Sequence, residues 1–215
     1  MTDVSRVLSL IRKQTERFII PSVTLISYNK DPYQVLVSCI LSLRTKDKTT
    51  IEAAKRLFRV APCPQDMIKL TRLRLEKLIF PVGFYHRKAK VILDLSRKII
   101  REFNAKVPSK IEDLLSFKGV GRKTANLVLG LGFNIPAICV DTHVHRISNR
   151  LGWINTKSPE DSEAALEKII PKNLWIDLNT ILVGFGQNLC QPVSPICSRC
   201  SVVNFCKRKG VIRSR

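Results

Sequence analysis

The sequence predicts an all-α protein, and three observations support this prediction. Apolar residues recur at helical spacing through most of the 215 residues, and no two alternating apolar runs are joined by a hairpin turn. No internal repeat or low-complexity linker interrupts the pattern. Hydrophobic residues make up 45% of the chain, which is enough for a packed core and excludes a wholly disordered basic protein. The length allows one large domain or two modest ones.

In the first half of the chain, apolar spacing and prolines mark the predicted helices. Residues 33–43 are apolar on nearly every face, which indicates a fully buried helix. A second helix contains Ile51 to Phe58 and ends before a pair of prolines, and a third ends before Pro81. A fourth helix, over residues 88–103, carries a broad apolar stripe.

In the second half, capping residues mark where helices begin. Ser109 and Glu112 fit a capping box, in which the hydroxyl accepts one backbone N–H and the carboxylate another. Ser158 is a second N-cap, with Pro159 at the first helical position. A last helix is expected over residues 174–185.

The chain carries a formal net charge of +20, with 37 Lys and Arg against 17 Asp and Glu. Nucleic acid is the first partner that such a charge suggests, because neutralising phosphates releases condensed counterions. An anionic membrane would favour one basic amphipathic helix, whereas here the basic residues are spread along the chain. A well-solvated surface that binds nothing is the remaining alternative.

The sequence carries no membrane or secretion signal. No run reaches the roughly 18–20 apolar residues that span a bilayer, and the N-terminal residues lack a signal-peptide pattern. Seven cysteines in such a chain indicate a reducing compartment, where thiols bind metal or are buried. We therefore expect a cytoplasmic protein with no membrane contact, associated with the nucleoid if its source is prokaryotic.

Four cysteines near the C-terminus follow the spacing C-x6-C-x2-C-x5-C: Cys190, Cys197, Cys200 and Cys206. Prolines in the first gap indicate a loop that can wrap around a metal. Four thiolates without a histidine suit zinc or an iron–sulfur cluster, and the spacing alone leaves both open. Buried structural thiols are expected instead at Cys39 and Cys139.

A turn with two glycines, Gly119 and Gly121, joins two predicted helices, and the second helix begins near Arg122. Glycines let a phosphate approach the backbone, and the amides that open a helix point outward as donors. Lys123 then falls in the first helical turn, where the helix dipole and neighbouring cations favour a neutral amine. Lys123 is therefore a candidate nucleophile, and a solvated surface lysine is the plain alternative.

Asp141 follows a short apolar run and is expected to be the N-cap of a helix that runs to Gly152. A capping carboxylate at the edge of a cleft can also act on a substrate, and the two roles are compatible. His143 and His145 are too close in sequence to share one helical face, so a metal site built from histidines is not expected.

Together these segments resemble the endonuclease III family, the helix–hairpin–helix DNA glycosylases of base-excision repair. The resemblance rests on LLSFKGVGRKTANLVLG, VDTHVHRISNRLG and the cysteine spacing, in that order, and PYQVLVSCILSLRTKD and VGFYHRKAK also match family segments. It implies a two-domain α-helical fold. Residues 1–24 and 136–215 would form a helical domain with a 4Fe–4S cluster, and residues 25–135 a six-helix bundle that ends in the helix–hairpin–helix motif.

The resemblance also implies a bifunctional DNA glycosylase/AP lyase. Lys123 matches the lysine that attacks C1′ of the damaged nucleotide, which leads to a Schiff base and to β-elimination 3′ to the abasic sugar. Asp141 matches the carboxylate that assists cleavage of the glycosidic bond. The substrates would be oxidised or saturated pyrimidines extruded from duplex DNA, and the four cysteines would hold the cluster.

The implied partner is double-stranded DNA that contains a damaged base or an abasic site, bound by a monomer. The residues expected to contact DNA are Arg44, Phe84, Gly119, Val120, Gly121, Arg122 and His143. Arg44 and Phe84 match positions from which the family inserts wedge residues into the base stack. Two departures stand out, because Arg44 replaces a usual glutamine and Lys118 a usual proline.

Two other functions fit part of the pattern. One is a monofunctional glycosylase of the same superfamily that removes thymine, uracil or adenine from mismatches, although a lysine at position 123 favours the bifunctional enzyme. The other is a non-catalytic helix–hairpin–helix DNA-binding module with structural zinc. A visible absorption spectrum separates the two metals, because a 4Fe–4S protein is yellow-brown and a zinc protein is colourless.

Overall fold

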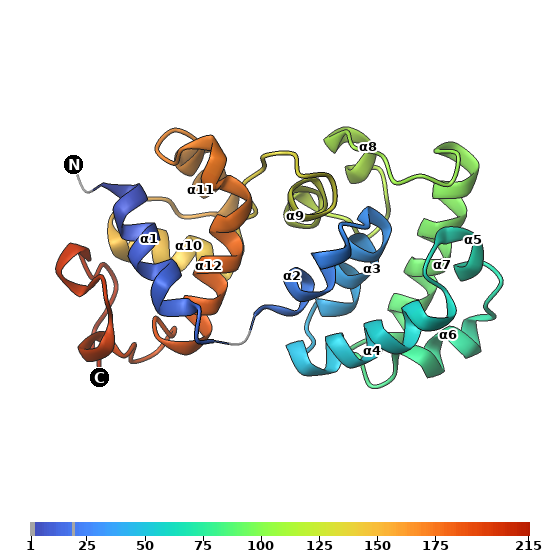
Figure 1. The fold of residues 1–215 in the computed structure, drawn as a ribbon, viewed down its shortest axis with the longest axis horizontal. Helices are drawn as coiled ribbons and strands as arrows, with labels where there is room; N and C mark the ends of the chain where they lie inside the picture. Colours follow the sequence, from blue (N-terminus) through green and yellow to red (C-terminus); the bar gives the residue numbers. More distant parts are fainter. Residues whose placement is uncertain (1–2, 19) are drawn as a thin grey trace. The chain divides into compact units, whose positions relative to one another are not determined.

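The protein is all-helical, as the sequence predicts (Figure 1). The computed structural model describes residues 3–18 and 20–215, and no strand occurs among them. The chain divides into two compact units. The central unit is Ser22–Ile135, and the terminal unit combines Met1–Pro21 with Pro136–Arg215. The boundaries between the units lie after residues 21 and 135, whereas the sequence predicted boundaries after residues 24 and 135.

The central unit is built around one buried helix. Its α-helices are α2 (Ser22–Ile26), α3 (Pro32–Ser42), α4 (Asp47–Val60), α5 (Pro64–Met67), α6 (Arg72–Ile79), α7 (Tyr85–Glu102), α8 (Ile111–Leu115) and α9 (Arg122–Phe133). In α3, every residue from Val35 to Leu41 is buried, which confirms the prediction for this segment. Asp31 caps α3, because its Oδ1 accepts the N–H groups of Tyr33 and Gln34 at 2.8 and 3.1 Å.

Helices α3 and α9 pack closely against each other. A Cβ added at Gly132 of α9 would lie 2.9 Å from the Cα of Pro32, so a glycine is needed where the two backbones approach. Every residue of α9 from Thr124 to Gly130 is buried. The position of the α9 N-terminus is therefore fixed by apolar packing of the rest of that helix.

Two features of the central unit differ from the sequence prediction. The capping box at Ser109 is wrong: α8 begins at Ile111, its N-cap residue is Lys110, and no side chain caps it. Ser109 lies one residue too early, because Lys110 already has the extended backbone of an N-cap residue. Pro64, expected only to break a helix, also begins one, since it occupies the first turn of α5.

The terminal unit has four α-helices in its described residues: α1 (Val4–Thr15), α10 (Thr142–Leu151), α11 (Pro159–Glu167) and α12 (Trp175–Asn188). Helix α12 packs against both α1 and α10, and apolar side chains from all three helices form one core. Ser158 caps α11 as predicted, since its hydroxyl accepts the N–H of Asp161 at 3.1 Å.

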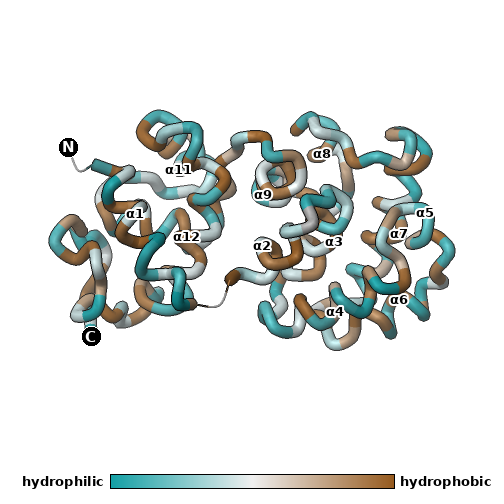
Figure 2. Tube along the Cα trace, in the orientation of Figure 1, coloured by the Kyte–Doolittle hydropathy of each residue, from teal (hydrophilic) through white to brown (hydrophobic). Residues whose placement is uncertain are grey.

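Hydrophobic and hydrophilic residues alternate along the helices of both units, as Figure 2 shows. This pattern is typical of amphipathic helices that bury one face. Among the helices of the described residues, none combines the length and the apolar character that crossing a membrane requires.

Candidate functional site

The turn between α8 and α9 is anchored by apolar residues and exposes its glycines. Phe117 and Val120 are buried, and the Val120 N–H donates to the Phe117 carbonyl at 3.1 Å. Gly119 has a φ of +87°, and a Cβ there would lie 3.3 Å from Val91, so geometry and packing both require a glycine. Gly121 is exposed and serves as the N-cap residue of α9.

Gly121 has no such packing reason to be glycine. A Cβ built on it meets nothing within 4 Å, its φ of −101° suits any residue, and no side chain caps α9 at this position. The missing side chain leaves the first turn of α9 open to a ligand that approaches the backbone.

Lys123 occupies the first turn of α9, directly after Gly121 and Arg122, and is exposed. The next residue, Thr124, begins the buried stretch of the helix. The charge of Lys123 acts on Cys39 in α3: burial raises the pKa of the Cys39 thiol to about 12, and the Lys123 charge partly opposes this rise. Cys39 and Cys139 are both buried, as predicted.

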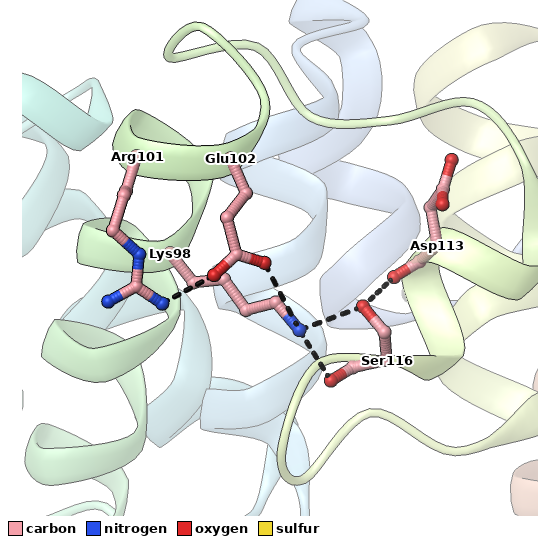
Figure 3. A network of polar contacts seen from close by, with 5 residues as sticks. All are labelled: Lys98, Arg101, Glu102, Asp113 and Ser116. Atoms are coloured by element: carbon pink, nitrogen blue, oxygen red, sulfur yellow. Dashed lines mark hydrogen bonds and ion pairs between the residues drawn. The ribbon is translucent and has the colours of Figure 1, made fainter.

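A polar network from α7 holds Ser116, the C-cap residue of α8, directly before the turn (Figure 3). The Lys98 ammonium donates to both the carbonyl and the hydroxyl oxygen of Ser116 at 3.0 Å and forms an ion pair with Glu102 at 3.6 Å. The Ser116 hydroxyl donates to the Asp113 carbonyl at 2.6 Å, and Arg101 also pairs with Glu102. The turn is thus held by α7 as well as by its own apolar residues.

Arg44 and Phe84, the predicted wedge residues, lie against each other. The Arg44 guanidinium carbon is 5.7 Å from the centroid of the Phe84 ring, a cation–π distance. Both residues have left-handed backbones, with φ of 52° and 58°, and both are exposed. A Cβ at Gly83 would lie 2.5 Å from the Arg44 carbonyl oxygen, so Gly83 allows the two turns to touch.

Asp141 is the N-cap residue of α10, which confirms its predicted structural role. Its Oδ1 accepts the N–H groups of His143 and Val144, both at 2.9 Å, and the residue is half-buried. Lys123 belongs to the central unit, whereas Asp141 and His143 belong to the terminal unit. Gly152 ends α10 in a left-handed conformation, as expected.

Two arginines of α10, which the sequence did not predict, hold residues 190–206, the segment that contains the four cysteines (the cysteine segment). Arg150 donates to the carbonyl oxygens of Gln191 and Pro192, both at 2.6 Å. Arg146 donates to the Cys190 carbonyl at 2.8 Å and lies 3.2 Å from Nδ1 of His143. Their spacing of one helical turn on an amphipathic helix was the only signal in the sequence.

The four predicted metal-binding cysteines line one apolar cavity, together with residues of α10 and α12. Nη1 of Arg150 donates to the Cys190 sulfur at 3.6 Å, and the backbone N–H of Arg208 donates to the Cys206 sulfur at 3.4 Å. Burial raises the pKa of Cys200 to about 11 and also raises that of Cys206, so a cation is needed to form their thiolates at neutral pH.

The donor chemistry therefore fits a thiolate-bound metal group. All four cysteines line one apolar cavity, and N–H groups donate to the sulfurs of Cys190 and Cys206. Among the described residues, no three His, Cys, Asp or Glu side chains are placed to hold a single metal ion.

Comparison with known proteins identifies the family. Residues 37–172 match the family model described as HhH-GPD superfamily base excision DNA repair protein. Endonuclease III of Thermotoga maritima is 46% identical over 190 residues, which cover 86% of this chain and 89% of the relative. A trapped covalent intermediate of endonuclease III with DNA matches with a TM-score of 0.82 and 32% identity, covering 95% of this chain and 94% of the other. A thermostable thymine-DNA glycosylase matches with the same TM-score and coverage at 26% identity.

The matched region contains both the glycine turn and the α10 N-terminus. The chain therefore belongs to the HhH-GPD superfamily of base excision DNA repair proteins and, within it, to the endonuclease III family of DNA glycosylase/AP lyases.

Proposed function

We propose that this protein binds duplex DNA, excises oxidised or saturated pyrimidines, and cleaves the strand 3′ to the abasic sugar with Lys123 as the nucleophile. The observation that carries the proposal is the position of Lys123. It is exposed in the first turn of α9, next to a turn whose second glycine is not required by packing. An amine in this place is reachable by a sugar whose phosphates lie on the turn.

The proposed reaction has two bond-breaking stages. The neutral Lys123 amine attacks C1′, the glycosidic bond breaks, and the base leaves with its bonding electrons and takes up a proton. Opening of the sugar ring gives an iminium ion between C1′ and the lysine nitrogen. Loss of a proton from C2′ then expels the 3′-phosphate, and water finally hydrolyses the imine to release the lysine.

Asp141 is proposed to assist both base departure and activation of the lysine. Its carboxylate is half-buried and fixed by two backbone N–H groups, so little further ordering is required when DNA binds. A fixed negative charge favours the cationic character that develops at C1′ as the base leaves. The N-cap role and the catalytic role use the same side chain.

Extrusion of the damaged base requires something to occupy the gap in the stack. Arg44 and Phe84 form an exposed pair of suitable chemistry, with one cationic and one aromatic group in contact. The hairpin residues Gly119 to Arg122 are proposed to bind phosphates, and the surplus of positive charge adds affinity that does not depend on sequence. His143 is proposed to contact DNA near Asp141.

The four cysteines are proposed to hold a 4Fe–4S cluster. When bound, the cluster would supply iron–thiolate bonds that tie the C-terminal segment together. Arg146 and Arg150 already hold the start of this segment against α10, the helix that begins at Asp141. The chain's own contribution is thus to connect the cysteine segment to the helix that carries the catalytic carboxylate.

Borohydride trapping tests the assignment of the nucleophile. Borohydride reduces an imine to a stable amine, so wild-type protein is expected to form a covalent complex with duplex DNA that contains an abasic site. Lys123→Ala is expected to form none, whereas Lys77→Ala, which removes an exposed lysine of α6, should trap like the wild type. Trapping that persists in Lys123→Ala would reject Lys123 as the nucleophile.

A second candidate is a monofunctional mismatch glycosylase, which the similarity to a thymine-DNA glycosylase favours. Such an enzyme would remove thymine or uracil from a mismatch but would neither cleave the strand nor be trapped. A non-catalytic module with zinc would neither remove a base nor cleave the strand, and it would be colourless. Incision of thymine glycol, dihydrouracil, mismatch and abasic-site duplexes, together with an absorption spectrum, separates the three.

A further inference from the structure

Lys88 of α7 is a buried lysine whose side-chain partners carry no charge. It is only 6% exposed. Its ammonium donates to the carbonyl oxygens of Leu41 and Leu43 at 2.9 and 2.5 Å and to the Thr45 hydroxyl at 3.1 Å. Burial lowers the pKa of Lys88 to about 8. A buried amine is costly, so its presence here calls for a reason beyond filling space.

The oxygens that Lys88 binds belong to residues on both sides of Arg44 in the sequence. Helix α3 ends at Ser42, and the chain then enters the left-handed conformation at Arg44. A cation at a helix C-terminus satisfies carbonyls that have no partner within the helix. Because its ammonium donates to acceptors in the residues before and after Arg44, Leu43 and Thr45, Lys88 stabilises a backbone conformation that a non-glycine residue otherwise disfavours.

Lys88 is also linked to the Phe84 turn. The Thr45 hydroxyl accepts from the Lys88 ammonium and from the Gly83 N–H, the latter at 3.2 Å, and donates to the Leu43 carbonyl at 3.2 Å. A hydroxyl has one donor and two acceptor sites, so Thr45 is fully used. In addition, the backbone N–H of Lys88 donates to the Phe84 carbonyl at 3.0 Å.

We propose that Lys88 is a positioning residue that holds Arg44 and Phe84 together as one preformed wedge for base extrusion. Side-chain bonds from Lys88 fix the Arg44 turn, and a backbone bond together with Thr45 fixes the Phe84 turn. The inference rests on the proposed function, because a wedge has a purpose only if a base is extruded. Preformed groups avoid the ordering cost that two flexible turns would incur on meeting DNA.

Stopped-flow fluorescence of 2-aminopurine placed beside a dihydrouracil in duplex DNA tests the inference. The 2-aminopurine fluorescence changes because the bases unstack when the lesion is extruded. All proteins in this assay carry Lys123→Ala, so that no bond-breaking step contributes to the signal. Adding Lys88→Met is expected to slow unstacking by about tenfold, the order of effect of losing a charged hydrogen-bond donor. Lys90→Met is the matched control, because it removes an exposed charge from the same helix and should leave the rate unchanged.

A readout with intact Lys123 separates positioning from general destabilisation. Lys88→Met should lower excision from paired duplex by about tenfold and leave excision from an unpaired bulge within about twofold, since a bulged base needs no wedge. An equal loss on both substrates, or an unchanged unstacking rate, would overturn the inference. If Lys88→Met does not fold, Thr45→Val, which removes the link to Gly83, is expected to lower excision from paired duplex and not from the bulge. An equal loss on both substrates would then overturn the inference. If the protein with unaltered Lys88 neither unstacks the duplex nor excises dihydrouracil, the proposed function itself has failed.

Discussion

Helices α9 and α10 carry the two candidate catalytic residues, and different interactions hold them in place. Helix α9 has Gly121 as its N-cap residue, with no side-chain cap, and is fixed by its buried residues and its packing against α3. Helix α10 has Asp141 as its N-cap residue, whose carboxylate caps it, and two of its arginines bind the cysteine segment. One N-terminus is left open and the other is filled by the protein itself.

This contrast matches the two proposed tasks. An open helix N-terminus with neighbouring cations suits a phosphate supplied by DNA. A capped N-terminus suits a carboxylate that must stay in place before substrate arrives. The contrast also predicts different dependencies, because the apolar core holds α9 and the cysteine segment helps to hold α10.

The largest effect is expected from removing the proposed cluster. Cys200→Ser should lose iron and colour and weaken α10, because metal binding is coupled to folding of the segment that Arg146 and Arg150 hold. Hydrogen exchange should become faster in α10 and stay slow in α9. Iron analysis and mass spectrometry check this result, and Cys63→Ser, outside the segment, should retain both iron and protection. Equal loss of protection in both helices would remove the contrast.

Asp141→Asn is expected to have the next largest effect. Asparagine still caps a helix, so unfolding free energy should change by less than about 0.5 kcal/mol. Loss of the charge should nevertheless slow base removal by about 10²- to 10⁴-fold in single-turnover assays. Asp161→Asn changes an exposed carboxylate in the first turn of α11 and should not slow excision. An unchanged rate in Asp141→Asn would reduce Asp141 to a structural cap.

Replacing the two glycines before α9 by alanine should affect different properties: mainly stability at Gly119 and mainly DNA binding at Gly121. Gly119→Ala should cost about 1–2 kcal/mol of unfolding free energy, because its backbone is left-handed and Val91 is close. Gly121→Ala should cost less, about 0.5–1 kcal/mol, but weaken DNA binding several-fold, because its methyl group faces the proposed phosphate site. Urea unfolding and fluorescence anisotropy with duplex DNA measure the two effects. If Gly121→Ala bound DNA like the wild type, the open N-terminus would have no binding role.

Short-range signals explain why both helix starts could be predicted from sequence. Gly121 before Arg122, and Asp141 before Thr142, each lie within one turn of the structure that they define. The same reasoning failed at Ser109, where a shift of one residue moved the cap to Lys110. Boundaries depend on small local preferences, whereas the presence of a helix depends on many apolar residues.

The polar anchors could not be predicted, because their partners are distant in sequence and belong to the backbone. Lys88 binds the carbonyl of Leu41, and Arg150 binds that of Gln191. Any residue type supplies a carbonyl, so no complementary side chain appears in the sequence. The contact between Arg44 and Phe84 could not be predicted either, because it depends on the close approach of two turns that Gly83 allows.

The smallest expected effect compares how the anchors of the two units respond to pH. Arg146 carries a guanidinium, a group that is not deprotonated in proteins, whereas burial lowers the pKa of the Lys88 amine to about 8. The folded pKa of Lys88 lies below its ordinary value of 10.5, so between pH 8 and 10.5 the folded protein binds fewer protons than the unfolded chain. The contribution of Lys88 to unfolding free energy should therefore rise with pH, by about 1 kcal/mol from pH 8 to pH 9.

Urea unfolding of the wild type and Lys88→Met across this range measures that contribution as a difference. Tyr33 and Cys39 have pKa values raised by burial, so they lower stability as pH rises, but they do so in both proteins and cancel. The difference should grow in favour of the wild type. A constant difference would mean that the bound carbonyls keep Lys88 charged, in which case the central unit is anchored by a permanent cation, as the terminal unit is.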